Sequence, residues 1–240
     1  RFILRSSFKR LRRLLAAVQP DNSRRSTWSD YSLEKSNYSE AHLKAKDDFV
    51  ESALNEFQPK RVLDVGCNIG KYSAMAASTG ASVIAIDAHA VVAGQSWQSA
   101  RSGSLDILPL VVNLSRPRPA IGWRNGECPS FLDRARGAFD AVLMLAVVHH
   151  LLVSERIPLQ EIVDLAADLT TDILLIEFVA PDDSMFRRLA RGRDQLFSDL
   201  TSELFLDSCR QRFDLIRSHH LDGTSRWLFL LRKKGSPGNA

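Results

Sequence analysis

The sequence has few cysteines and no long apolar run. Only Cys67, Cys128 and Cys209 occur in 240 residues, and they lie far apart. An odd number of scattered cysteines predicts neither a disulfide framework nor a structural zinc site, so we expect a reducing, cytoplasmic setting. A membrane-spanning helix needs about 18 consecutive apolar residues, and the longest candidate, residues 141–148, is much shorter. The sequence therefore predicts no transmembrane segment.

Acidic residues are scarce only at the start of the chain. Residues 1–25 hold eight basic residues and one acidic residue, a net charge of +7, whereas the whole chain carries +4. Residues 26–240 are therefore mildly acidic, at −3. The isoelectric point near 9.1 comes from one terminal segment, which weakens the case for a nucleic-acid-binding core.

Within that basic segment, apolar residues recur at helical spacing from Phe2 to Leu15, with arginines between them. The pattern predicts a basic amphipathic helix that ends before Pro20. Such a helix packs on its own domain or on upstream chain; the alternative is peripheral membrane or partner-protein contact through residues 1–19. We expect an irregular lead-in over residues 21–39 and a helix over residues 39–57. The predicted domains are a helical extension, 1–56, and a catalytic domain, 57–240.

From Arg61 onward, apolar strand-like runs alternate with helical stretches, which favours an α/β fold with a parallel sheet covered on both faces. The predicted strands are residues 62–65, 82–87, 107–112, 139–148 and 172–179, and the main helices are 71–78, 91–101 and 159–169. Two further runs, 213–221 and 226–232, flank Asp222-Gly223, a hairpin signal. The sheet is thus expected to end in an antiparallel pair.

A glycine turn connects the first strand to its helix. Gly66 and Gly70 lie where a ligand can approach the backbone and meet helix amide groups. Asp87 closes the second strand, where an acidic side chain can hold a ribose diol in a nucleotide-binding βαβ unit. Gly-x-Gly-x-x-Gly spacing is absent, because Cys67-Asn68 interrupts it, so a dehydrogenase is the less favoured alternative.

The run Val62-Leu-Asp-Val-Gly-Cys-Asn-Ile-Gly70 resembles the first motif of the class I S-adenosylmethionine-dependent methyltransferases, and the resemblance covers about residues 57 to 234. It implies a Rossmann-like fold with a seven-stranded mixed sheet, an antiparallel last strand, S-adenosylmethionine as cofactor and S-adenosylhomocysteine as product. It also implies cofactor-binding residues: Asp64, Gly66, Cys67, Asn68 and Gly70 near the methionine end, Asp87 at the ribose and Asn113 at the adenine.

The motif departs from the family at Asn68, where many members have glycine. Asparagine tolerates left-handed backbone better than most residues, so the turn is expected to survive. The same variant occurs in some methyltransferases that act on RNA 5′ ends. Simpler alternatives are that Asp64 caps the following helix or binds a loop amide and that Asp87 is the N-cap of the helix beginning near Ala90. We interpret Cys67 as a small loop residue, because no neighbouring cation lowers its thiol pKa.

His149 and His150 follow the fourth strand at the carboxyl edge of the sheet, where α/β folds bind ligands. A histidine there can remove a proton from a hydroxyl or amine acceptor, so both are candidate catalytic bases. The alternative is that they pack beneath the cofactor and cap a loop. Their separation from Glu177 gives no metal-ligand spacing, and we predict no metal site.

Substrate candidates lie in two further segments. The loop around residues 115–127 is longer than a plain connection, and its Trp123, Arg124 and Glu127 are candidates for stacking on or orienting an acceptor, unless the loop only covers the sheet. Glu177 lies in an acidic cluster with Asp182 and Asp183, either at a cationic acceptor or, as we favour, as solvated charge and helix caps. The predicted function is methyl transfer to a hydroxyl or amine of a small molecule by in-line displacement; the alternatives are an RNA methyltransferase and a non-catalytic docking module.

Overall fold

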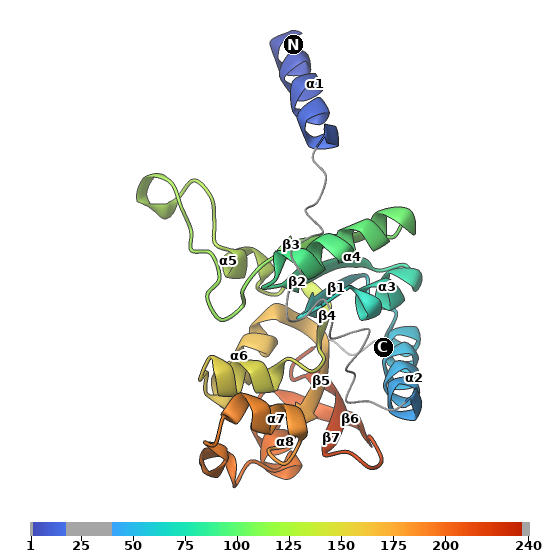
Figure 1. The fold of residues 1–240 in the computed structure, drawn as a ribbon, viewed down its shortest axis with the longest axis vertical. Helices are drawn as coiled ribbons and strands as arrows, with labels where there is room; N and C mark the ends of the chain where they lie inside the picture. The colour runs from blue at the N-terminus through green and yellow to red at the C-terminus, as the bar shows by residue number, and fades with distance from the viewer. Residues whose placement is uncertain (1, 18–39, 237–240) are drawn as a thin grey trace.

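A seven-stranded sheet forms the centre of the molecule. The computed structural model describes residues 2–17 and 40–236 (Figure 1). The strands are β1 Arg61–Val65, β2 Ser82–Asp87, β3 Ile107–Val111, β4 Phe139–Met144, β5 Thr170–Val179, β6 Phe213–His220 and β7 Arg226–Lys233. Their order is β3-β2-β1-β4-β5-β7-β6. The first five strands are parallel, whereas β7 is antiparallel to β5 and to β6. The predicted Rossmann-like fold with an antiparallel last strand is confirmed.

Helices follow the strands as the periodicity predicted. The helices are α1 Phe2–Ala17, α2 Glu40–Phe57, α3 Lys71–Ser78, α4 Ala90–Ser102, α5 Phe131–Ala135, α6 Leu159–Leu169, α7 Ser184–Ala190 and α8 Ser202–Arg210. Single turns occur at η1 Trp123–Asn125, η2 His150–Ser154 and η3 Asp194–Phe197. The segment after Pro181 contains α7, whose last turn carries two arginines. The irregular lead-in expected over residues 21–39 lies outside the described residues.

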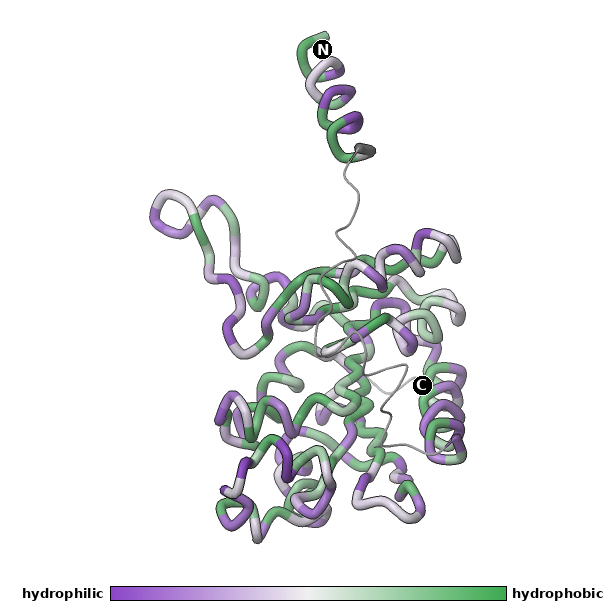
Figure 2. Tube along the Cα trace, in the orientation of Figure 1, coloured by the Kyte–Doolittle hydropathy of each residue, from purple (hydrophilic) through white to green (hydrophobic). Residues whose placement is uncertain are grey.

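Apolar side chains on the two faces of the sheet form two cores. One core joins alternate strand residues to α2 and α3; the other joins the intervening residues to α6 and α8. Within β1, for example, Val62 faces the first core, whereas Leu63 and Val65 face the second. Figure 2 shows the resulting concentration of hydrophobic chain in the central strands and of hydrophilic chain in the outer loops. Because both faces are covered, the carboxyl edge of the sheet is the open route to its central strands.

The end of β4 differs from its prediction. The apolar run was expected to stay extended as far as Val148, but β4 ends at Met144, and Ala146 has a positive φ of 55°. Leu145 and Val148 are still buried. Hydrophobicity reports burial, and a buried turn satisfies it as well as a strand does, so the pattern alone could not locate this end.

The N-terminal helices differ in their surroundings. In α1 every large apolar side chain from Phe2 to Leu15 is exposed, and the helix is basic and amphipathic as predicted. In α2, by contrast, Phe49, Val50 and Leu54 are buried in the core beside the sheet. Among the described helices, none has the length and apolar character to cross a membrane. The division at residues 56 and 57 stays a prediction.

Candidate active site

A cavity of about 750 Å³ opens at the carboxyl edge of the sheet, next to the ends of β1, β2, β3 and β4. Its wall brings together eight of the predicted site residues: Asp64, Gly66, Cys67, Asn68, Asp87, Asn113, His149 and His150. These residues come from the ends of four neighbouring parallel strands, β1 to β4, and from the loops that follow them. The topology therefore assembles the site, as expected for the carboxyl edge of an open α/β sheet.

The loop from Gly66 to Gly70 needs left-handed backbone at three positions. Gly66, Asn68 and Gly70 have φ values of 70°, 51° and 86°. A Cβ atom on Gly70 would lie 2.4 Å from Oγ of the buried Ser96, so no larger residue fits without a shift. The prediction that asparagine would tolerate the turn at position 68 agrees with its backbone. Gly70 lies outside the cavity wall and acts on the shape of the loop.

Asp64 is a buried carboxylate inside β1. It accepts a hydrogen bond of 2.5 Å from Oγ of Ser73 and a further one from the backbone of Ser73, in the first turn of α3, so the alternative role at the start of that helix is compatible with the structure. Burial raises the pKa of Asp64 to about 6, although the Ser73 hydroxyl and the Lys46 ammonium both oppose the shift. Burial therefore destabilises the charged form of Asp64 unless a cation lies beside it. A ligand that carries an ammonium group would supply such a cation.

Asp87 connects the end of β2 to the glycine loop. Its carboxylate accepts hydrogen bonds from the backbone N–H groups of Asn68 at 3.1 Å and His89 at 2.8 Å. His89 is the residue that caps α4, and it makes no side-chain cap bond, so Asp87 is not the N-cap of that helix. Asn113, after β3, uses Oδ1 to accept from the backbone N–H and the hydroxyl of Ser115.

His149 and His150 lie together in the cavity wall, with ring centroids 4.2 Å apart. Burial lowers the pKa of His149 well below its usual range, and the neighbouring His150 adds to the shift. Burial, together with Arg226, lowers the pKa of His150 to about 4. Both imidazoles are therefore neutral near pH 7, and each is a weaker base than a free histidine.

Two polar atoms of the site have no partner within the described chain. Nδ1 of His149 and Oδ1 of Asn68 are buried without a hydrogen bond. A buried polar atom left unpaired costs free energy, about 1–3 kcal/mol, unless a ligand or water satisfies it. The wall thus offers bonds that a bound ligand would complete.

Sequence reasoning missed the part of the wall that α2 contributes. Lys46 lines the cavity, and its Nζ lies 2.6 Å from Oε2 of Glu177. A signal was present, because Lys46 falls on the apolar stripe of α2, three residues after Leu43 and three before Phe49. A lysine on a buried helix face calls for an anionic partner, but the sequence alone does not identify the partner.

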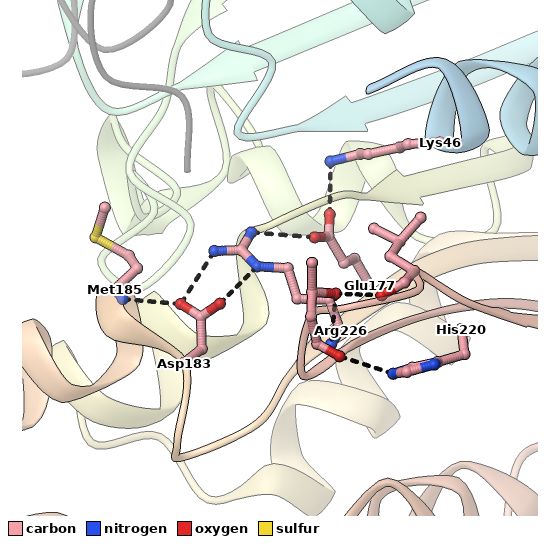
Figure 3. A network of polar contacts seen from close by, with 8 residues as sticks. Lys46, Glu177, Asp183, Met185, His220 and Arg226 are labelled. Atoms are coloured by element: carbon pink, nitrogen blue, oxygen red, sulfur yellow. Dashed lines mark hydrogen bonds and ion pairs between the residues drawn. The ribbon is translucent and has the colours of Figure 1, made fainter. Parts of the chain in front are cut away.

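The favoured interpretation of Glu177 as solvated charge is wrong. Glu177 belongs to a buried ion network (Figure 3). Its carboxylate is fully buried, and its other oxygen accepts from Arg226 at 3.3 Å. Arg226 also binds Asp183 through two nitrogens, at 2.8 and 3.1 Å. Asp183 does act as the N-cap of α7, as predicted, by accepting from the backbone N–H of Met185. The network joins α2, β5, α7 and β7.

The remaining substrate candidates lie on an arm, residues 113–130, that projects from the body (Figure 1). A bridge between Ile121 and Cys128 closes the arm. At its tip Trp123 is 80% exposed. Trp123, Arg124 and Glu127 do not line the cavity in the described structure. Their role as substrate contacts stays a prediction.

Cys67 is buried in the glycine loop. Burial raises the pKa of the Cys67 thiol, which agrees with its interpretation as a small loop residue and not a nucleophile. Over residues 2–17 and 40–236, no group of three histidine, cysteine or acidic side chains is arranged to hold a metal ion.

The chain is similar to a known family and to a curated protein. Residues 63–167 match a family model described as a methyltransferase domain. The nodulation protein NoeA of Rhizobium meliloti (strain 1021) is 29% identical over 222 residues, which are 91% of this chain and 45% of that protein. The chain therefore spans about half the length of this curated relative.

Solved structures share the fold at low sequence identity. The N-methyltransferase NodS from Bradyrhizobium japonicum WM9, in complex with S-adenosylhomocysteine, has a TM-score of 0.59 and 13% identity, covering 82% of this chain and 90% of its own. Magnesium protoporphyrin IX methyltransferase (ChlM) from Synechocystis PCC 6803, with the same ligand bound, has a TM-score of 0.56 and 18% identity, covering 95% and 94%.

Proposed function

We propose that this chain, whose residues 63–167 match a methyltransferase domain, is a class I S-adenosylmethionine-dependent methyltransferase that transfers the methyl group of S-adenosylmethionine to a hydroxyl or amine of a small-molecule acceptor. The observation that carries this proposal is one cavity that combines the glycine loop, the Asp87 carboxylate and two neutral histidines. S-adenosylmethionine supplies a positively charged sulfonium whose methyl group is already activated for in-line displacement. The protein has to align the acceptor with that methyl group and exclude water.

The polar residues of the cavity fit the polar groups of this cofactor. Asp87 would accept bonds from the ribose hydroxyls, and Asn113 would lie at the adenine, as the family resemblance implies. Oδ1 of Asn113 already accepts two bonds from Ser115, so any contact with the adenine amino group would share that oxygen. The unpaired Oδ1 of Asn68 and the buried Asp64 carboxylate suit the donor groups of the ligand.

His149 is the better candidate for the base. Its Nδ1 is buried and unpaired within the described chain, and the neutral ring can accept the proton that a hydroxyl or amine loses as it attacks. His150 is the alternative base, since it lines the same wall. General base catalysis typically contributes about a hundredfold or more to the rate. The low pKa values keep the bases unprotonated in neutral solution.

The small-molecule class of acceptor is supported by the mildly acidic body of the chain. Peripheral membrane or partner contact through residues 1–19 and the division into residues 1–56 and 57–240 remain parts of the proposal. If the division holds, the catalytic unit still requires α2, because α2 contributes core residues and Lys46 to the cavity.

Incubation with methyl-labelled S-adenosylmethionine tests the function. The purified chain is supplied either with the small-molecule fraction of a cell extract or with its RNA fraction, and we expect label in the small-molecule fraction. Label in the RNA fraction would support an RNA methyltransferase instead. A folded chain that binds no S-adenosylmethionine and labels neither fraction would favour the docking module.

Histidine variants test the assignment of the base. In His149→Gln we expect turnover to fall about a hundredfold while affinity for S-adenosylhomocysteine is retained. His219→Gln is the matched control, because His219 lies in β6 and does not line the cavity. Full activity in both His149→Gln and His150→Gln would mean that neither histidine is the base.

A further inference from the structure

The cavity wall contains a cation that the roles above leave unused. Lys46 reaches the wall from α2, and its side chain is only 5% exposed. Lys71, the other lysine in the wall, is 47% exposed and pairs with Asp47 at 2.7 Å. The two lysines therefore lie in different environments. Lys46 is the desolvated one, and a desolvated cation binds an anion more strongly than an exposed cation does.

Sheet order places Lys46 at a defined end of the cavity. Asp87 follows β2 and Asn113 follows β3, so both lie on one side of β1. Lys46 is bonded to Glu177 in β5, on the other side of β1. Asp64 lies between them, in β1 itself, and is close enough to Lys46 for the ammonium to lower its pKa.

This order matches the layout of S-adenosylmethionine if, as proposed above, Asp87 holds the ribose. The amino-acid part of the ligand then extends past Asp64 toward Lys46. That part is a zwitterion, with an ammonium group and a carboxylate on one carbon. Asp64 can accept from the ammonium, and the carboxylate requires a cation beside it.

We propose that Lys46 binds the carboxylate of the methionine end of S-adenosylmethionine. The inference rests on the proposed function and identifies a cofactor-binding residue contributed by α2. An ammonium carries three donor hydrogens, so its bond to Glu177 is compatible with another to a ligand. Glu177 also accepts from Arg226, and the two cations around it share its charge (Figure 3). Figure 3 shows Lys46 extending from α2 toward Glu177.

Two ligands that differ only in the carboxylate measure its contribution to binding. Decarboxylated S-adenosylmethionine keeps the adenosine, the sulfonium and the ammonium and lacks only the carboxylate. In calorimetric titrations we expect the wild-type chain to bind S-adenosylmethionine about ten- to a hundredfold more tightly than the decarboxylated ligand. In Lys46→Met that ratio should fall to near one, through weaker binding of S-adenosylmethionine alone.

Three further variants keep the test interpretable. Lys44→Met is the matched control, since Lys44 is on the same helix but exposed and paired with Asp48. It should keep the wild-type ratio, and Lys46→Arg should keep part of it. If Lys46→Met folds poorly because Glu177 loses a partner, Lys46→Met combined with Glu177→Gln removes the charge imbalance, and the same collapse of the ratio is expected.

The outcomes separate this inference from the function on which it rests. A ratio that survives in Lys46→Met, or a wild-type chain that binds both ligands equally, would overturn the role of Lys46 while leaving cofactor binding intact. A folded wild-type chain that binds neither ligand would overturn the proposed function and this inference with it.

Discussion

The two ends of the cavity are built in different ways. The glycine-loop end, formed by residues 66–70 and Asp87, is local: Asn68 and the carboxylate that binds it are 19 positions apart. At the other end only Lys46 lines the cavity, and its partner in the buried ion network, Glu177, is 131 positions away along the chain. The first end depends on backbone geometry, whereas the second depends on charges that stabilise one another only in the completed fold.

The largest expected effect lies in the ion network. In Glu177→Gln, Lys46 and Arg226 lose a buried anionic partner, and we expect the free energy of unfolding to fall by about 3–5 kcal/mol. Glu56→Gln, which breaks a half-exposed pair between α2 and Arg217, should cost less than about 1 kcal/mol. Urea denaturation measures both. Equal small losses would mean that the network contributes no more than a surface pair.

The glycine loop should respond through its backbone. Gly70→Ala introduces a Cβ atom against Ser96 and also forces alanine into left-handed backbone, so we expect a loss of about 2–4 kcal/mol in stability. Gly80→Ala is the matched control, because Gly80 has a φ of 93° and nothing within 4 Å of the added atom. It should lose only about 1–2 kcal/mol. Thermal unfolding measures the stability of both variants. Equal losses of stability would mean that the Ser96 side chain moves aside without an energetic cost.

A smaller effect is expected from pH. Since the pKa of Asp64 is raised to about 6 by burial, its carboxylate is charged at pH 7.5 and protonated at pH 5. An ammonium ligand favours the charged form, so affinity for S-adenosylhomocysteine should be constant above about pH 6 and fall by up to about tenfold per pH unit below it. In Asp64→Asn the affinity should be lower at pH 7.5 and lack this dependence. If the affinity of the wild-type chain stayed constant down to pH 5, Asp64 would not contact the ammonium group of the ligand.

The same contrast explains what the sequence could predict. The succession of strands and helices along the chain, the hairpin at Asp222-Gly223 and the glycine loop follow from short-range patterns of hydrophobicity and turn residues, and the structure has them. The Lys46–Glu177 pair could not be predicted, because a helix face shows that a charge is buried but not which distant side chain meets it. The long loop containing Trp123 was equally ambiguous, since loop length does not say whether an arm turns toward a cavity or away from it.

The proposed function requires the carboxyl edge of this sheet to bind the adenosyl cofactor through Asp87. Calorimetric titration of the purified chain with S-adenosylhomocysteine tests it most directly, with Asp87→Ala as the site variant and Asp106→Ala, at an exposed position before β3, as the control. We predict saturable one-to-one binding by the wild-type and Asp106→Ala chains and binding at least about tenfold weaker in Asp87→Ala. Folded wild-type protein that gives no binding heat, or equal affinity in Asp87→Ala, would contradict the account.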